Sequence, residues 1–312
     1  MRIVLEAAER IRSLEVQGAT NVALTAVKAL VEQMKSSETE DRESVLAEVS
    51  DAKEILFDTR ETEPFMRNAV RYIERKLTES DLQAVGELQK LAEKASSELF
   101  DEFQESRRLT AQIGSKRIRQ GYTVLTHCHS SAVTMVFREA VNQGVDFSVI
   151  LTETRPRYQG RITASELVEM GVEATMIVDS AVRSFIKESD LVLVGADAIT
   201  SEGNVINKIG SSQVALVADE ARIPFYVVTE LLKFDPQTVH GDYEAIEERD
   251  AGEVWSEAPA KLAIRNPAFD VTRREHIHGI ICEEGIISPH SVMDVIRRRY
   301  PWLLESPVPS TR

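Results

Sequence analysis

The sequence has few cysteines and no long apolar run. Its 312 residues include only Cys128 and Cys282, too few for a disulfide framework and consistent with a reducing compartment. No apolar stretch approaches the roughly 20 residues that a membrane-spanning helix needs. The first ten residues carry acids at helical spacing, which a signal peptide lacks. We therefore expect a cytoplasmic protein that does not bind membranes and keeps Cys128 as a free thiol.

An excess of positive charge is also missing. The chain has 37 Lys and Arg against 51 Asp and Glu, a formal net charge of −14, which argues against broad binding to nucleic acid. A small anionic ligand remains compatible, because a few local basic residues suffice to hold it. The acid-rich stretches 38–54 and 242–257 are most simply solvated surface. Neither a Walker motif nor G-x-G-x-x-G occurs, and we expect no cofactor.

What is present divides into two halves. Residues 1–119 show apolar positions at helical spacing, with a long helix at 79–118 that connects the halves. Residues 120–312 alternate between strands and helices, and most of the strands are continuously apolar, as strands buried on both faces are. The expected strands are 122–125, 147–152, 174–178, 191–194, 225–229 and 279–282. We predict an α/β protein, in which an N-terminal helical domain precedes a doubly wound, mostly parallel, Rossmann-like sheet domain.

Polar side chains follow several of these strands, where doubly wound sheets bind ligands. Thr126-His127-Cys128-His129-Ser130 follows the first strand, and Asp197 follows the fourth after two small residues. Nearby imidazoles and a helix N-terminus lower the pKa of a thiol and make it a better base or nucleophile. We expect Cys128 and Asp197 to face one pocket. Core packing of Cys128 and a capping role for Asp197 are the alternatives.

A second motif, Asn207-Lys208-Ile209-Gly210-Ser211-Ser212, leads into a helix. Glycine and serine before a helix expose backbone N–H groups, which bind anions, and Lys208 and Lys233 add positive charge. The motif predicts a phosphate clamp, with a capped helix beside a surface lysine as the alternative. We expect no metal, because the consecutive residues 127–129 cannot all point at one ion and zinc needs three or four ligands.

Together these motifs resemble those of the archaeal ribose-1,5-bisphosphate isomerases. That family shares a superfamily with methylthioribose-1-phosphate isomerase and with the α, β and δ regulatory subunits of translation initiation factor 2B. The segments that carry the resemblance are 126–130, Glu153-Thr154-Arg155-Pro156, Gln159-Gly160, Gly195-Ala196-Asp197, Asn207-Lys208-Ile209-Gly210, Lys233-Phe234 and 266–272. The presence of both Cys128 and Asp197 is typical of the enzymes rather than of the regulatory subunits.

The resemblance implies an aldose–ketose isomerase without a metal, which converts ribose 1,5-bisphosphate to ribulose 1,5-bisphosphate in AMP and nucleoside breakdown. Cys128 would move the proton at C2 of the sugar, and Asp197 would act as acid and base on the oxygens. It also implies a homo-oligomer, either a dimer or a trimer of dimers, with AMP as an activator. The implied substrate and phosphate contacts are Gln17, Gly18, Ala19, Thr20, Arg60, Ser130, Asn207, Lys208 and Lys233.

Two departures keep other functions open. Gln17 stands where the isomerases usually have arginine, so a charge-assisted contact worth roughly 1.5–3 kcal/mol is missing. Glu61-Thr62-Glu63 replaces the proline and the small or apolar residues typical of the family. A non-catalytic regulatory subunit, or an isomerase of another sugar 1-phosphate such as methylthioribose 1-phosphate, remains possible on sequence grounds. The acidic segment 241–259 is expected to be a flap or an interface loop.

Overall fold

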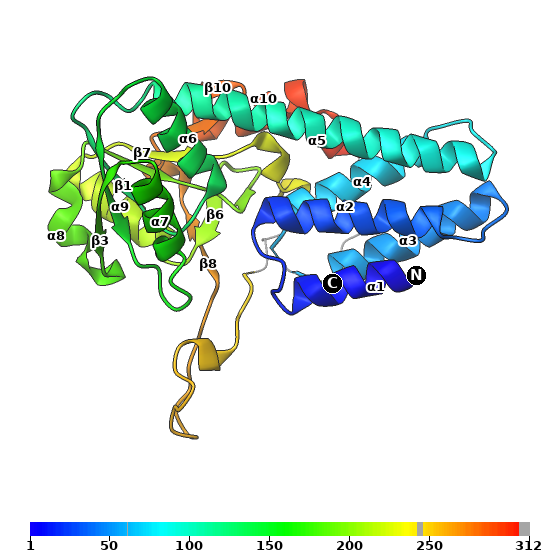
Figure 1. Ribbon diagram of the computed structural model, residues 1–312, viewed down its shortest axis with the longest axis horizontal. Helices are drawn as coiled ribbons and strands as arrows, with labels where there is room; N and C mark the ends of the chain where they lie inside the picture. Colours follow the sequence, from blue (N-terminus) through cyan, green and yellow to red (C-terminus); the bar gives the residue numbers. More distant parts are fainter. Residues whose placement is uncertain (61, 242–245, 306–312) are drawn as a thin grey trace. The chain divides into compact units, whose positions relative to one another are not determined.

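The computed structural model describes residues 1–60, 62–241 and 246–305, so Glu61 and residues 242–245 lie outside the described residues. The chain forms two compact units, Met1–Glu105 and Ser106–Arg312 (Figure 1). The boundary between them lies inside a single helix, α5, which runs from Val85 to Ser115. Among the described residues no helix is both long and apolar enough to cross a bilayer.

The first unit is helical. Its other helices are α1 (Arg2–Arg12), α2 (Ala19–Lys35), α3 (Arg42–Phe57) and α4 (Pro64–Thr78). Helix α2 packs against α1, α3 and α4, because small and branched residues fill its inward face. Helix α5 begins later than the sequence predicts. The guanidinium of Arg42 donates hydrogen bonds to the carbonyls of Leu77 and Leu82, which hold the connection between α4 and α5 in a non-helical conformation.

The second unit contains a seven-stranded sheet in the order β10-β9-β7-β4-β1-β2-β3. All neighbouring pairs are parallel except β10 and β9, which confirms the α/β prediction. The strands are β1 (Thr123–Thr126), β2 (Ser148–Thr152), β3 (Glu173–Ile177), β4 (Leu191–Val194), β7 (Phe225–Val228), β9 (Gly279–Cys282) and β10 (Gly285–Ile287). The helices are α6 (Ser131–Asn142), α7 (Gly160–Glu169), α8 (Val182–Phe185), α9 (Ser211–Ala221), α10 (Val292–Arg299) and α11 (Trp302–Glu305).

The order of the strands fixes where a ligand is expected. From β1 the chain moves outward through β2 and β3, and from β4 it moves outward in the other direction through β7 and β9. Strands β1 and β4 are adjacent and parallel, with Val124 paired to Leu191. The carboxyl ends of such a pair form the switch point at which doubly wound sheets bind their ligands. Cys128 and Asp197 follow these two strands.

A second, antiparallel sheet was not predicted from the sequence. It consists of β5 (Ala198–Ile199), β6 (Val205–Lys208) and β8 (Phe269–Thr272), in the order β5-β6-β8. Asn207 and Lys208 therefore belong to a strand rather than to a loop, and Lys208 pairs with Phe269. This pairing fixes the position of Lys208 relative to the carboxyl end of the main sheet.

Candidate active site

The backbone of Cys128 is strained and is held by hydrogen bonds to two threonine side chains. Its φ of 68° lies in the left-handed region, which costs a non-glycine residue about 1 kcal/mol or more. The Cys128 N–H donates to Oγ1 of Thr154 at 2.9 Å, and Thr163 Oγ1 donates to the Cys128 carbonyl at 3.1 Å. The turn at Thr154 is fixed in its own right, because Asp179 accepts from its N–H at 2.8 Å. The fold thus holds Cys128 in a conformation that the chain alone disfavours.

The ring nitrogens of His127 are hydrogen-bonded to groups other than the thiol of Cys128. Its Nε2 lies 2.8 Å from the carbonyl of Ile209, and its Nδ1 lies 2.6 Å from Oγ1 of Thr152. A neutral ring with its proton on Nε2 satisfies both contacts, because a carbonyl only accepts. Burial lowers the pKa of His127 and keeps it neutral. A Cβ atom at Gly210 would come within 3.0 Å of the ring, so glycine there lets the loop after β6 approach His127.

His129 has a similar structural role. Its Nδ1 lies 3.1 Å from Thr163 Oγ1, the hydroxyl that also holds the carbonyl of Cys128. Burial lowers the pKa of His129, and the nearby Glu166 carboxylate only partly offsets that effect. The prediction that two flanking imidazoles lower the pKa of the thiol is therefore wrong. Neutral rings supply no positive charge to stabilise a thiolate.

The thiol of Cys128 is instead hard to ionise. Its pKa is raised from an ordinary value of 9.0 to about 11, mainly by burial and to a smaller extent by the charges of Asp197 and Asp179. The positive charge of Lys208 is the main opposing influence. Cys128 is therefore a thiol at neutral pH. The same electrostatic couplings show that Cys128, Asp197 and Lys208 share one neighbourhood at the switch point.

The predicted anion site at the N-terminus of α9 is already filled by a side chain. The Asp270 carboxylate accepts hydrogen bonds from the N–H groups of Gly210 and Ser212 and from the Ser212 hydroxyl, at 2.8 to 3.2 Å. The prediction that these N–H groups await a phosphate is therefore wrong. Burial raises the pKa of Asp270, although these donors oppose the shift. Asp270 comes from β8, and its pairing with β6 places it at this helix end.

The side chain of Asn207 is hydrogen-bonded, whereas that of Lys208 lies over an aromatic ring. Asn207 is buried, and its amide donates to Ser211 Oγ at 2.8 Å, so it ties β6 to α9. Lys208 is only 8% exposed, and its ammonium lies 4.9 Å from the centre of the Phe269 ring. Burial lowers the pKa of Lys208. Lys208 is thus a buried cation that interacts electrostatically with both Cys128 and Asp197.

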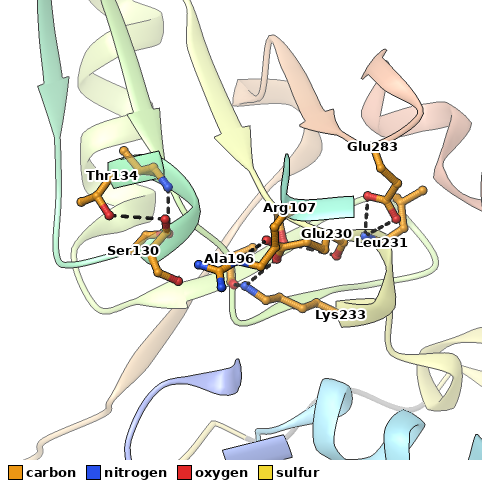
Figure 2. Close-up of polar contacts among 11 residues, drawn as sticks. Arg107, Ser130, Thr134, Ala196, Glu230, Leu231, Lys233 and Glu283 are labelled. Carbon is orange, nitrogen blue, oxygen red and sulfur yellow. Dashed lines mark hydrogen bonds and ion pairs between the residues drawn. The ribbon is translucent and has the colours of Figure 1, made fainter. Parts of the chain in front are cut away.

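Lys233 is held by a chain of polar contacts (Figure 2). Its Nζ donates to the carbonyl of Ala196 at 3.0 Å and lies 3.3 Å from Oε2 of Glu230. The other oxygen of Glu230 lies 3.8 Å from Nε of Arg107. Ala196 immediately precedes Asp197, so Lys233 fixes the peptide that carries Asp197. Of these two contacts of Nζ, the one to the Ala196 carbonyl has hydrogen-bond geometry, and the one to Glu230 is an ion pair.

Ser130 caps α6, with its hydroxyl accepting from the Val133 N–H at 3.5 Å. A Cβ atom at Gly195 would lie 2.4 Å from the Ser130 hydroxyl oxygen. The absence of a side chain at Gly195 therefore makes room for the Ser130 side chain.

The remaining predicted contacts lie in the first unit. Gly18 has a φ of 83° and is the N-cap of α2, so Ala19 and Thr20 form the first turn of that helix. The Gln17 amide donates to the carbonyl of Leu14 at 2.9 Å. Arg60 is 6% exposed, and its guanidinium lies 3.5 Å from Glu63. Glu61, the other departure from the family pattern, lies outside the described residues.

The described part of the acidic segment 241–259 contacts the turn after β2. Arg157 forms an ion pair with Glu253 at 2.8 Å, and Arg155 donates to the carbonyl of Val254 at 2.9 Å. Asp250 caps the short turn between them by accepting from the Gly252 N–H. Within the described ranges, no group of three or more His, Cys, Asp or Glu side chains is arranged to hold a metal ion.

Sequence reasoning missed several residues that shape this site. Each acts through a hydrogen bond or an ion pair to a residue that is distant in sequence, and they are Thr154, Asp179, Asp270 and Glu230. Asp270 and Thr154 lie in motifs that the resemblance singles out, so their place in those motifs was a signal. Glu230 lies just after strand β7, which is a local signal, whereas nothing local marks Asp179.

Comparison with known proteins agrees with this architecture. Residues 15–289 match the initiation factor 2 subunit family, and the chain belongs to that family. A solved structure of translation initiation factor eIF-2B from Pyrococcus horikoshii is similar, with a TM-score of 0.80 and 31% identity over 92% of this chain and 97% of that one.

Curated relatives define the chain further within the family. The ribose 1,5-bisphosphate isomerase of Archaeoglobus fulgidus is 47% identical over 96% of this chain and 94% of the relative. The methylthioribose-1-phosphate isomerase of Acetivibrio thermocellus is 34% identical over 91% of this chain and 88% of the relative. The chain is accordingly an enzyme, and its class is that of the isomerases.

Proposed function

We propose that the protein converts ribose 1,5-bisphosphate to ribulose 1,5-bisphosphate. The observation that carries the proposal is the placement of Cys128 and Asp197 after the adjacent strands β1 and β4, at the switch point of the sheet, with the buried Lys208 beside both. An aldose–ketose isomerisation needs one group that takes a proton from carbon and another that serves the oxygens. A thiol and a carboxylate in one water-poor site meet that need.

In this proposal Asp197 transfers protons to and from the sugar oxygens during ring opening, and Cys128 as thiolate removes the proton at C2. The proton returns at C1 to complete the ketose. With a pKa of about 11, the thiolate is scarce at pH 7 but is a stronger base than an ordinary cysteine. Lys208 favours the thiolate, since its charge is the main influence that lowers this pKa.

The test is turnover of ribose 1,5-bisphosphate by the purified protein, with detection of the ketose. Cys128→Ser and Asp197→Asn should each lower kcat by about 10²–10⁴-fold, the usual contribution of a general acid or base. Cys282→Ser is the matched control, because Cys282 is also buried but ends β9, where its thiol lies 3.6 Å from the Gly285 carbonyl. No ketose from the wild-type protein, or full activity in Cys128→Ser, would refute the proposal.

A second candidate substrate is methylthioribose 1-phosphate. It is favoured by Gln17, which cannot neutralise a phosphate and whose amide is already bonded to the Leu14 carbonyl. This sugar carries one phosphoryl group fewer. Comparison of kcat/KM for the two substrates separates the candidates, and a higher value for the monophosphate would favour the second.

The family resemblance supports the setting of this reaction. We place it in the cytoplasmic breakdown of AMP and nucleosides, in a homo-oligomer that AMP activates. Turnover measured with and without AMP, and the mass of the protein in solution by light scattering, test these two points. A monomer with unchanged turnover would contradict both.

A further inference from the structure

Two cations with buried side chains lie in the second unit, and the first of them interacts electrostatically with Cys128, Asp197 and the second. One is Lys208, whose side chain forms no hydrogen bond or ion pair with any described residue and lies over the face of the Phe269 ring. The other is Arg249, whose side chain is 8% exposed. Buried charges in proteins are normally paired, because an unpaired charge away from water costs several kcal/mol.

Arg249 has donors without acceptors. In the described part of the chain, its Nε–H and Nη1 groups are buried and make no hydrogen bond. The nearest carboxylate is Glu247, with Oε1 3.2 Å from Nε, which is within ion-pair range but outside hydrogen-bond geometry. A guanidinium in a stable structural pair usually donates directed, often bidentate, hydrogen bonds. Glu247 therefore does not account for the fork of donors on Arg249.

Backbone pairing brings Arg249 to the site. Its N–H donates to the carbonyl of Asn266 at 2.9 Å, and the Ala268 N–H donates to the carbonyl of Glu247 at 2.8 Å. On the other side of the same segment, the Ile209 N–H donates to the Ala268 carbonyl at 3.0 Å. Residues 247–249 and 208–209 thus flank residues 266–268. The charge of Arg249 acts on Lys208, and lowers its pKa in addition to the larger effect of burial.

We propose that Arg249 and Lys208 together bind one phosphoryl group of the substrate. A phosphoryl dianion offers several strong acceptors, which match the unpartnered donors of a guanidinium and an ammonium, and its charge offsets the repulsion between them. Arg249 is therefore a specificity residue, which favours sugars that carry a dianion at this position. The inference rests on the proposed function for the identity of the sugar, but not for the existence of the phosphate subsite.

The test is calorimetric binding of ribulose 1,5-bisphosphate and of inorganic phosphate to the full chain, together with kcat and KM for ribose 1,5-bisphosphate. Arg249→Gln should weaken binding of the bisphosphate about 10- to 100-fold, as expected for the loss of charge-assisted hydrogen bonds. KM should rise by a similar factor, and kcat should change less. Arg249→Lys keeps the charge but not the fork, and should fall between the wild type and Arg249→Gln.

Two further variants separate a ligand role from a structural one. Arg265→Gln removes another arginine from the same part of the chain, an exposed one paired with Glu248, and should bind like the wild type. Glu247→Gln removes the neighbouring carboxylate. If Arg249 served only the ion pair, Glu247→Gln and Arg249→Gln would lose similar stability and neither would change binding. If Arg249 binds phosphate, Glu247→Gln should bind as tightly as the wild type or more tightly.

The outcomes distinguish this inference from the proposed function. Arg249-dependent binding of the bisphosphate without turnover would support the subsite and refute the isomerase proposal. Normal turnover with wild-type KM and affinity in both Arg249 variants would refute the subsite and leave the isomerase proposal intact. Failure of the wild type to bind either phosphate probe would also refute the subsite.

Discussion

At Cys128, enclosure has two opposite effects. The threonine hydroxyls that surround its backbone stabilise a disfavoured conformation, while burial of its side chain disfavours the thiolate. Only Lys208 among its neighbours supplies a charge large enough to rank as a main opposing influence. The reactivity of Cys128 therefore depends on a cation that is distant in sequence, and not on the histidines beside it.

This dependence can be measured by alkylation. In a Cys282→Ser background, the rate of Cys128 modification by iodoacetamide should rise about tenfold per pH unit between pH 7 and 9, because the thiolate fraction grows by that factor well below a pKa of about 11. Lys208→Met should slow the reaction at every pH, because it removes the charge that lowers this pKa. Peptide mass spectrometry follows the modified residue. A rise clearly smaller than tenfold between pH 8 and 9 would show a thiol with an ordinary pKa.

Gly195 makes a steric prediction. A Cβ atom there would lie within 2.4 Å of the Ser130 hydroxyl and 2.6 Å of its Cβ, so Gly195→Ala should cost about 1–3 kcal/mol of unfolding free energy. Adding Ser130→Gly should recover part of that loss, and urea denaturation of the single and double variants measures the coupling. Gly86→Ala, where no atom lies within 4 Å, is the control. Additive losses would mean that the clash is relieved elsewhere.

The two residues proposed to transfer protons could be located from the sequence, whereas the surroundings that position and charge them could be located only in part. Cys128 and Asp197 could be assigned to strand ends because the apolar runs before them are continuous and short. Lys208 could be identified as a charge near the site, but not as a strand residue. Arg249 lay in an acidic stretch that composition alone assigns to solvent. Its burial depends on pairing with residues 266–268, which no local pattern reveals.

At the scale of elements, the parallel strands were predictable because burial on both faces leaves a continuous apolar signal. Strands β1, β4 and β9 follow that signal, and their burial is high. Strand β3 lies at the edge of the sheet and is largely exposed, and its sequence is accordingly less continuously apolar. The β5-β6-β8 sheet was missed, since β5 has two residues and β8 is only partly apolar. Its pairing joins segments that are far apart in sequence.

Helix α9 depends on one residue of that missed sheet. Asp270→Ala should destabilise the protein by about 1–2 kcal/mol, because the N-terminus of α9 loses the carboxylate that caps it. Asp270→Asn keeps one acceptor and should cost less. Urea denaturation with an unchanged m-value measures both, and Asp101→Ala on the exposed face of α5 serves as the control. Equal stability of all three variants would refute the capping role.

At the scale of the whole molecule, Glu283 links folding to pH. It is 8% exposed, accepts from the Leu231 N–H and the Tyr300 hydroxyl, and burial raises its pKa from 4.5 to about 7. Between these two values the folded protein binds more protons than the unfolded chain does. The stability of the protein should therefore fall as pH rises from about 4.5 to 7, with no further contribution above that range.

Glu283→Gln tests this linkage. The pKa difference of about 2.5 (about 7 minus 4.5) corresponds to about 3 kcal/mol, which the wild type should lose between pH 4.5 and 8 relative to the variant. Unfolding free energies from urea denaturation at pH 5 and pH 8 provide the comparison. Parallel changes in the two proteins would show that Glu283 titrates normally and that burial does not hold it protonated.

The boundary between the two units lies within α5, between Glu105 and Ser106. Each helical N–H is bonded to the carbonyl four residues earlier, so this boundary has no extended linker of the kind that proteases cleave. Limited proteolysis should therefore not release either unit. The same continuity restricts evolution by domain exchange, because any new partner for the α/β unit must arrive with a helix that continues α5 in phase.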